Sequence, residues 1–268
     1  MKMDFGVFCK STLDGDPVQH CISSIFGIAQ NADPSYLDWL MQAWLWTIAV
    51  ACLSLLIALV IGAIMGTLRT LPNSSFGSRL LVRGATAWVE LFRNIPILVQ
   101  VFLWYHVIPS FVLPLKEFPS YLLVSIALGF FTSARIAEQV RAGIQSLPSG
   151  QMAAATALGM NRMQCYRYVI LPMALRIIIP PLTSESMNVV KNSSVAFAVS
   201  VPELTLFAMQ AQEETSRGIE IYLVVTLLNR IAQTNPGDEA KVNLLRKGKE
   251  MSLKVQVGKR PKSKAAAR

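Results

Sequence analysis

The sequence is poor in charged residues and lacks the motifs of common catalytic sites. Only 15% of its 268 residues are Asp, Glu, Lys or Arg, whereas a soluble domain carries about 25%. No Gly-x-x-x-x-Gly-Lys-Ser/Thr loop, His-Glu-x-x-His or Gly-x-Ser-x-Gly motif occurs, so the chain does not bind ATP in the P-loop manner. Its two histidines, His20 and His106, are too distant in sequence to suggest a metal site.

Long uncharged runs are the most prominent feature of the chain. The first, residues 39–68, exceeds the roughly 20 residues that a helix needs to cross a bilayer. It starts too late and is too long for a secretory signal, so we interpret it as a retained span. Two further uncharged runs lie at 94–115 and 118–134, and weaker apolar segments lie at about 168–184, 189–210 and 219–228. The sequence therefore predicts an all-α polytopic membrane protein with about five spans.

The net charge of +9 would suggest a nucleic-acid partner if it were spread over the chain. Residues 229–268, however, hold eleven Lys and Arg against three acidic residues, which accounts for +8 of the total. The basic character therefore belongs to the tail, and we expect a lipid bilayer and no nucleic acid as partner of the main body.

The loop charges predict an orientation. Residues 68–83 and 142–167 carry arginines and no acidic residue, whereas the N-terminal segment 1–38 carries five aspartates against two lysines. Because positively charged loops stay in the cytoplasm, we expect a periplasmic N-terminus and a cytoplasmic tail. Five spans satisfy this pattern if 168–200 forms one continuous helix.

A moderately polar stretch, residues 151–172, interrupts the apolar pattern on the cytoplasmic side. Ala153–Ala157 favours a helix and Gly159 favours its end or a turn. Leu158, Met160, Met163 and Tyr166 would give a second short helix an apolar face. Pro172 is expected at the start of the next helix, where its missing N–H costs little. Such a pair of short helices is either a folding detail or a plug that docks into a partner's groove.

Four separated motifs occur in order and resemble those of type I ABC importer permeases. They are AAATALG followed after ten residues by ILP, VELFRNIPILVQVFLWY, SARIAEQVRAGIQSLPSGQ, and MNVVKNSSVAFAVSVPEL. The resemblance covers about residues 38–228 and is closest to the polar amino-acid branch that includes glutamate/aspartate permeases. Ala153 stands where the family usually has a glutamate, which puts a charge contact at that position in doubt.

The resemblance implies a function and a set of partners. Residues 39–228 would form the transmembrane domain of an importer for amino acids, with glutamate and aspartate as the expected substrates. Coupling helices at about 150–165 would contact an ATPase dimer that binds ATP and Mg²⁺, and no cofactor is expected in this chain. A second homologous permease and a periplasmic amino-acid-binding protein would complete an assembly in the bacterial inner membrane. The expected coupling residues are Ala153, Ala154, Ala155, Gly159, Met160, Met163 and Pro172.

Ionisable residues inside spans are costly and usually face a bundle interior or a pathway. Arg135, Glu138 and Arg141 share one helix face because they are spaced by three residues. The expected substrate pathway comprises Arg93, Arg135, Glu138, Glu185, Asn188 and Lys191. For Glu90, Arg93 and Arg141, interhelical salt bridging near the membrane boundary is the competing interpretation. Arg135 either binds a substrate carboxylate in a bidentate manner or forms a structural pair with Glu138.

Two features at the ends of the chain leave alternatives open. Cys9 and Cys21 fall on the predicted periplasmic side, where a disulfide can form, whereas Cys52 is expected in the core and Cys165 as a free thiol. The last apolar run stops at Leu228, and the tail 229–268 predicts a hairpin around Lys247-Gly248. This tail resembles the C-terminal part of a PDZ domain of HtrA-type proteases, without catalytic residues. A truncated or fused, non-transporting membrane scaffold is therefore the alternative function.

Overall fold

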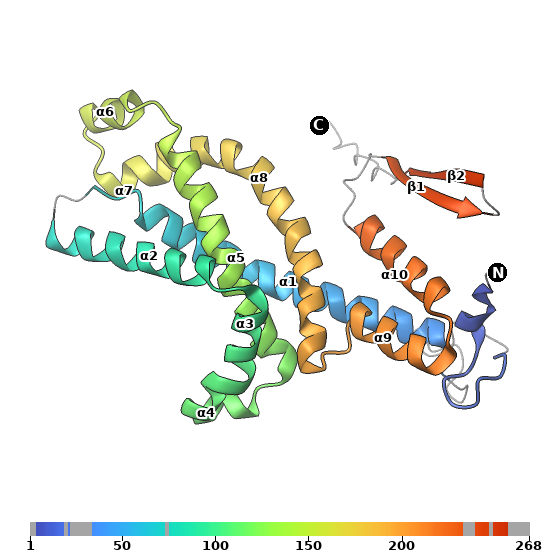
Figure 1. The fold of residues 1–268 in the computed structure, drawn as a ribbon. Coiled ribbons are helices and arrows are strands. Elements are labelled where there is room, and N and C mark those ends of the chain that lie inside the picture. Colours follow the sequence, from blue (N-terminus) through green and yellow to red (C-terminus); the bar gives the residue numbers. More distant parts are fainter. Residues whose placement is uncertain are drawn as a thin grey trace, which may run out of the picture. The chain divides into compact units, whose positions relative to one another are not determined.

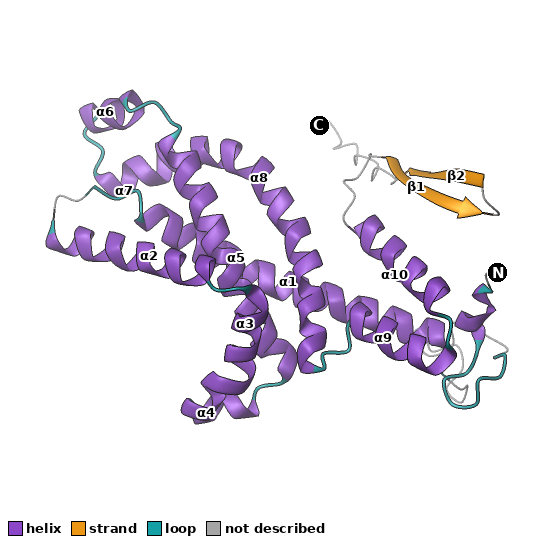
Figure 2. Ribbon diagram, in the orientation of Figure 1, coloured by secondary structure: helices purple, strands orange, loops and turns teal. Residues whose placement is uncertain are grey.

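The structure is a computed structural model that describes residues 4–18, 21, 34–72, 75–232, 239–246 and 249–256. Figure 1 shows the order of its elements, and Figure 2 shows that helices make up most of them. The chain divides into two compact units, Phe8–Phe207 and Met1–Val7 with Ala208–Arg268. The predicted all-α membrane fold is thus confirmed for the main body.

Helices account for nearly all of the larger unit. After the 3₁₀ turn Phe5–Cys9, its elements are α1 Tyr36–Leu68, α2 Phe76–Asn94, α3 Ile97–Phe102, η2 Leu103–Val107, α4 Ile108–Phe111, η3 Leu113–Glu117, α5 Ser120–Gln145, α6 Gly150–Ala157, α7 Arg162–Gln164, η4 Cys165–Ile170, α8 Leu171–Asn192 and η5 Ser193–Val199. η2 and η4 have π-helical geometry, and η3 and η5 are 3₁₀ helices.

α1 is the predicted first span. Ser35 caps it, since its hydroxyl accepts a hydrogen bond from the backbone N–H of Asp38 and the Asp38 carboxylate accepts from the Ser35 N–H. This reciprocal capping box satisfies two backbone donors that would otherwise be unpaired. At 1.5 Å per residue, 33 residues extend about 50 Å, which is ample for a bilayer core of about 30 Å.

α1 and α5 form the centre of this unit. A Cβ atom built on Gly62 would lie 2.7 Å from Ile136, and one on Gly129 would lie 2.7 Å from Ile57. The absence of side chains at these glycines lets the two helix backbones approach closely. Ile136, Val140 and Ile144 of α5 belong to one hydrophobic cluster with Ile170 of η4 and Ile178 of α8.

The second uncharged run does not form a straight helix, contrary to the simple expectation of one span there. α2 and the segment Ile97–Phe111 meet at an angle of 105°. Pro96 causes the break, because a residue that precedes proline is disfavoured in the α conformation, and Ile95 is extended. The side-chain amide of Gln100 donates hydrogen bonds to the carbonyls of Phe92 and Ile95, which α2 leaves free.

The segment after α6 forms one long helical run, as predicted for 168–200. Arg162–Val199 is long and apolar enough to cross a membrane, as are α1 and α5. The bent pair α2 with Ile97–Phe111 would be a fourth crossing, so the described residues contain three spans or up to four by this measure. Pro172 lies in the first turn of α8, where it was expected.

The N-terminal segment is tied together by a disulfide between Cys9 and Cys21, which settles the pairing that the sequence left open. Cys165 is a buried free thiol, as expected. Cys52 is exposed on the surface of α1, so its expected place in the core is wrong. The surface of a membrane span is itself apolar, and a sequence pattern without helix contacts does not distinguish its two sides.

The smaller unit contains α10, Gly218–Ala232, and the two strands β1, Glu239–Arg246, and β2, Lys249–Gln256. α9, Leu204–Thr215, crosses the boundary between the units. The 15 residues of α10 extend about 22 Å, less than a bilayer core of about 30 Å. The strands pair antiparallel from Glu239–Gln256 to Arg246–Lys249, which confirms the predicted hairpin.

Candidate functional site

The short helices α6 and α7, joined by a turn, follow the C-terminal end of α5. This end lies away from α3 and α4 (Figure 1). α6 ends at Ala157, and Gly159 has a positive φ of 80°. This left-handed conformation strains any residue with a Cβ, which explains the glycine. Asn161 caps α7, since its side chain accepts a hydrogen bond from the backbone N–H of Gln164.

Large apolar side chains project from this turn. Leu158 and Met163 are 78% and 77% exposed, respectively. Tyr166 points the other way, because it is buried and its hydroxyl donates a hydrogen bond to the carbonyl of Thr70. The predicted single apolar face is therefore divided: Leu158 and Met163 face outward, while Tyr166 anchors the segment to the end of α1.

The structure places the other expected coupling residues around this turn. Ala153, Ala154 and Pro172 are exposed, Met160 is half-buried and Ala155 is buried. The backbone N–H of Met160 donates a hydrogen bond to the carbonyl of Ala155 across the turn. The two short helices thus form a fixed corner with an apolar outer surface, which suits docking into a groove of a partner.

Glu138 of α5 is the centre of a second cluster. Its Oε1 lies 2.8 Å from Arg69 Nη1 and 3.6 Å from Arg93 Nη1, and its Oε2 lies 2.9 Å from Arg141 Nη2. Arg69 follows the end of α1, Arg93 lies in the last turn of α2, and Arg141 is on α5. One carboxylate therefore joins the ends of two helices to α5, which supports interhelical salt bridging for Arg93. For Arg141 that expectation is wrong, because its partner Glu138 lies one turn away on the same helix.

Arg135 pairs with Glu185 of α8. Arg135 Nε lies 3.0 Å from Glu185 Oε2, and its Nη2 donates to Oε1 over 3.0 Å. Both carboxylate oxygens are thus held by one guanidinium, which makes this a bidentate pair. The expected structural pair of Arg135 with Glu138 is therefore wrong. Although Arg135 and Glu138 are one turn apart on α5, α8 supplies a nearer carboxylate to Arg135.

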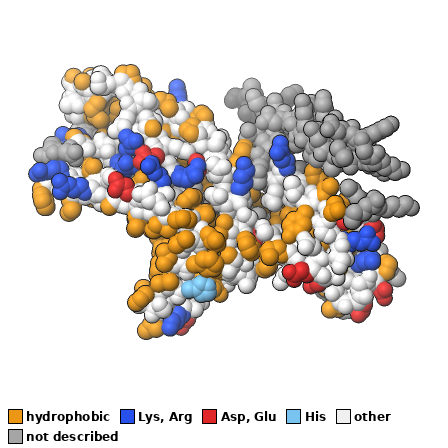
Figure 3. All heavy atoms as spheres, viewed as in Figure 1, with side chains coloured by type: hydrophobic (Ala, Val, Ile, Leu, Met, Phe, Trp, Pro, Cys, Tyr) orange, Lys and Arg blue, Asp and Glu red, His pale blue; other side chains and the backbone are white. Residues whose placement is uncertain are grey.

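The remaining predicted pathway residues lie on α8. Asn188 is half-buried and Lys191 is exposed. The Ser194 hydroxyl donates a hydrogen bond to the backbone carbonyl of Lys191 over 2.8 Å, a contact at the start of η5. Figure 3 shows charged side chains gathered where α2 meets α5, with hydrophobic surface continuing from there over α3 and α4.

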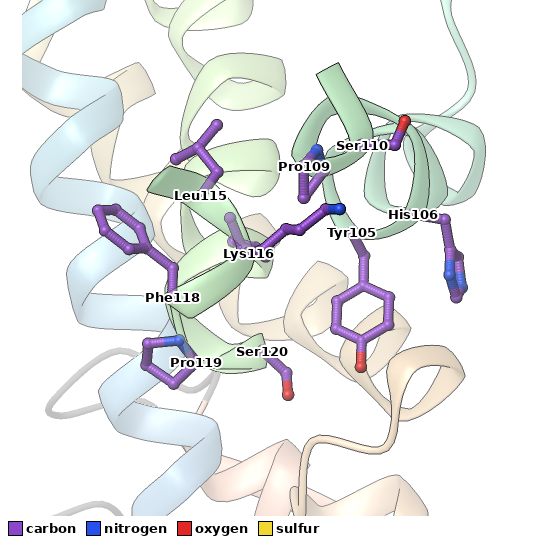
Figure 4. A pocket seen from close by; sticks show the side chains of 10 residues that line it. Tyr105, His106, Pro109, Ser110, Leu115, Lys116, Phe118, Pro119 and Ser120 are labelled. Atoms are coloured by element: carbon purple, nitrogen blue, oxygen red, sulfur yellow. The ribbon is translucent and has the colours of Figure 1, made fainter. Parts of the chain in front are cut away.

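A cavity of about 400 Å³ lies near the start of α5, between η2, α4 and η3. Its polar lining includes Tyr105, His106, Lys116 and Ser120. In Figure 4 the Lys116 side chain extends between Pro109 and Tyr105. The His106 ring points away from the Lys116 side chain. The cavity and the α6–α7 turn are at opposite ends of α5.

Glu203, just before α9, is a buried carboxyl group that the sequence reasoning did not single out. The backbone N–H of Leu206 donates a hydrogen bond to its Oε1 over 3.1 Å. Burial raises the pKa of Glu203 to about 7 despite its hydrogen bonds. Glu203 lies one residue before α9, where an acceptor side chain can cap free N–H groups. This position is the sequence signal that could have identified it.

Arg69 is a second residue whose role the sequence did not reveal. In the sequence it is one of the arginines of the positively charged segment 68–83, whereas in the structure its guanidinium makes the shortest contact of Glu138. Its partner is 69 positions away in sequence, and no local pattern predicts such a pair. Within the described part of the chain, no group of His, Cys, Asp and Glu is suited to hold a metal ion.

Comparison with known proteins places this architecture among membrane transport components. A family model described as the binding-protein-dependent transport system inner membrane component matches residues 58–228. The glutamate/aspartate import permease protein GltJ of Escherichia coli (strain K12) is 42% identical over 210 residues, which are 74% of this chain and 83% of GltJ. The probable glutamine ABC transporter permease protein GlnM of Bacillus subtilis (strain 168) is 41% identical over 142 residues, 53% of this chain and 64% of GlnM.

Solved structures share the fold. A crystal structure of an amino acid ABC transporter with histidines superimposes with a TM-score of 0.65 at 27% identity, over 74% of this chain and 89% of that one. An inward-facing structure of the MetNI methionine ABC transporter gives a TM-score of 0.60 at 23% identity, over 74% and 92% of the two chains. The latter shows a likeness of fold alone.

Proposed function

Because the chain belongs to the family of inner membrane components of binding-protein-dependent transport systems, we propose that it imports the acidic amino acids glutamate and aspartate. It is the permease subunit of an amino-acid ABC importer in the inner membrane, and it is not an enzyme. Such a permease works with an ATPase and a substrate-binding protein. The ATPase is a separate subunit, and ATP and Mg²⁺ would bind there.

The main support for acidic substrates is the position and pairing of Arg135. Its guanidinium already holds one carboxylate in a bidentate pair, and 42% of its side chain is exposed. An arginine in a membrane span attracts carboxylates and repels cationic amino acids. The 42% identity to GltJ, an import permease for glutamate and aspartate, supports the same substrate class.

The α6–α7 turn is the part of the chain that we assign to the ATPase. Leu158 and Met163 present exposed apolar side chains at a fixed corner, and such a corner fits an apolar groove. Closure of an ATPase dimer would push on this corner, and the long helical run Arg162–Val199 would carry the movement into the bundle. A second homologous permease would complete the membrane part, with the N-terminus periplasmic and the tail cytoplasmic.

Reconstitution tests the proposed substrate directly. The permease, its ATPase and its binding protein are placed in vesicles, and uptake of labelled glutamate is measured against unlabelled competitors. We expect aspartate to compete strongly, glutamine weakly and arginine not at all. Equal competition by glutamine or arginine would contradict the assignment of acidic substrates while leaving the permease function intact.

The alternative, a non-transporting scaffold derived from such a permease, is less favoured. The family match continues through most of α10 to residue 228, and the alignment covers 83% of GltJ. The observation that favours the scaffold is the short length of α10. ATPase that co-purifies with the permease, without ATP-dependent uptake of any amino acid, would support the scaffold.

A further inference from the structure

We propose that Glu185 is an internal competitor of the substrate: its carboxylate occupies Arg135 until a substrate carboxylate replaces it. This inference rests on the proposed function, since it assumes that acidic amino acids pass Arg135. It adds a regulatory role for Glu185, which would keep the pathway closed by imitating the substrate.

The geometry of the pair is that of a bound carboxylate. Both oxygens of Glu185 lie 3.0 Å from nitrogen atoms on one edge of the Arg135 guanidinium. A free carboxylate of an amino acid could bind an arginine through two contacts of the same kind, one to each oxygen. A second carboxylate at this guanidinium would repel that of Glu185, so strong binding of one carboxylate favours departure of the other.

The two partners differ in accessibility in the way that an exchange requires. The Arg135 side chain is 42% exposed, so an incoming carboxylate can reach it, whereas the Glu185 side chain is only 8% exposed. A buried carboxylate that loses its partner is strongly destabilised. Glu185 therefore cannot simply remain in place after the exchange, and the part of α8 that carries it has to move.

α8 has a suitable point for such a movement. Pro180 and Pro181 lie inside the helix, ahead of Glu185, and prolines remove backbone hydrogen bonds and allow bending. Before these prolines, Ala174 and Ile178 are buried against α5. After them, the ion pair with Arg135 is the charged contact that holds α8 to α5. Loss of this pair would remove the charged contact between the second half of α8 and α5, while the first half stays packed. Val189, which is buried in the second half, would have to move with Glu185.

The neighbouring carboxylate, Glu138, shows what a permanent contact looks like in this molecule. Three arginines surround it, one at the end of α1, one on α2 and one on α5 itself, so loss of one leaves two in place. Glu185 has a single ionic partner among the described residues. The cluster at Glu138 therefore holds α5 to α1 and α2. The pair of Arg135 and Glu185, in contrast, can be broken by a single carboxylate ligand that binds Arg135.

The movement would reach the proposed ATPase contact by a continuous path. α8 follows α7 and η4 in one long helical run, Arg162–Val199, and α7 adjoins the corner that bears Leu158 and Met163. Release of Glu185 by substrate would thereby alter the corner that meets the ATPase. This is a reason for ATP hydrolysis to depend on the substrate.

Two variants in the reconstituted complex test the exchange. In Glu185→Gln the competing charge is absent, so we expect half-maximal glutamate uptake at a roughly tenfold lower concentration, which corresponds to about 1.4 kcal/mol. We also expect ATP hydrolysis in the absence of substrate to rise. Glu117→Gln, which removes an exposed charge from η3, is the matched control and should leave both quantities unchanged.

The charge swap Arg135→Glu with Glu185→Arg keeps an ion pair between α5 and α8. If the pair served only to hold the helices together, the swapped permease would take up glutamate normally, and that result would overturn the proposal. We expect a permease that assembles with its ATPase but takes up no glutamate, because the accessible position then carries a negative charge. An unchanged half-maximal concentration in Glu185→Gln, with normal wild-type uptake, would equally refute it. Absence of glutamate uptake by the wild type would instead refute the proposed function.

Discussion

Gly62 shows how a missing side chain determines the packing of two spans. A Cβ there would come within 2.7 Å of Ile136 and 2.9 Å of the Ser133 carbonyl oxygen. The second of these atoms belongs to the backbone and cannot rotate away. The close approach of α1 and α5 at this position therefore requires a residue without a side chain.

Replacing Gly62 with alanine should therefore force α1 and α5 apart. We expect a loss of about 1–3 kcal/mol, the usual cost of overpacking a core, seen as a lower unfolding temperature in detergent. Gly84→Ala on α2 is the matched control, because a Cβ at Gly84 meets nothing within 4 Å. If both variants unfold at the same temperature, the proposed close packing of the two helices is wrong.

Glu203 makes the stability of the chain depend on pH. Its pKa is raised from 4.5 to about 7 by burial, so the folded chain keeps this proton over a range in which the unfolded chain has lost it. The stabilisation from the retained proton is complete below pH 4.5 and disappears as the pH rises through about 7. The shift corresponds to roughly 3 kcal/mol.

Glu203→Gln removes this titration and keeps an oxygen that accepts the Leu206 N–H. We expect the unfolding temperature of the wild type to fall between pH 5 and pH 8, and that of the variant to change less and to be higher at pH 8. The measurement is thermal unfolding in detergent over that range. Parallel curves for both proteins would show that Glu203 titrates normally.

Among the helices, the corner between α6 and α7 is the clearest candidate for contact with another subunit. The double substitution Leu158→Glu and Met163→Glu places charges on its two most exposed apolar side chains. We expect the permease to fold normally and to lose its ATPase, because a charge in an apolar groove is strongly disfavoured. Co-purification of the two subunits is the readout.

Leu13→Glu is the control for this prediction, because Leu13 is 71% exposed but belongs to the N-terminal segment. It should retain the ATPase in full. Equal retention by the corner variant would mean that Leu158 and Met163 face lipid or solvent and that the coupling contact lies elsewhere.

At the scale of elements, the second uncharged run was predicted as a span, but its bend was not predicted. Its composition predicted a span, and its length was sufficient, yet Pro96 divides it from α2 by a bend of 105°. The proline was visible in the sequence, and its restriction of Ile95 is a local effect. The stabilisation of the bend by Gln100 was not visible, since it depends on carbonyls of α2 that become free only when the helix ends.

In the molecule as a whole, the candidate sites belong to one of the two compact units. Arg135, Glu138, Glu185 and the α6–α7 corner all lie within Phe8–Phe207. The strands β1 and β2 pair with each other in a two-stranded sheet, and the tail 229–268 lies beyond the family match. Its resemblance to part of a PDZ domain stays a prediction.

A chain that ends after Ala232 should therefore keep its function. We expect normal glutamate uptake and normal binding of the ATPase, because neither the charged pairs nor the exposed corner is removed. Uptake in vesicles at matched amounts of protein is the measurement. Loss of uptake on this truncation would show that the basic tail is part of the transport machinery.

The sequence alone determined the membrane class, the first and third spans, the α6–α7 turn with Gly159, and the hairpin in the tail. Each depends on a run, a spacing or a turn residue within about 30 neighbouring positions, where helix and turn propensities act. Only the tertiary structure decided that Arg135 pairs with Glu185 and that Glu138 gathers Arg69, Arg93 and Arg141. Arg135 and Glu138 share a helix face in sequence, but the carboxylate nearest to Arg135 is set by how α8 crosses α5. That crossing depends on close packing between α5 and α8, as at Gly143 and Ile178, which are 35 positions apart in the sequence and which no local pattern brings together.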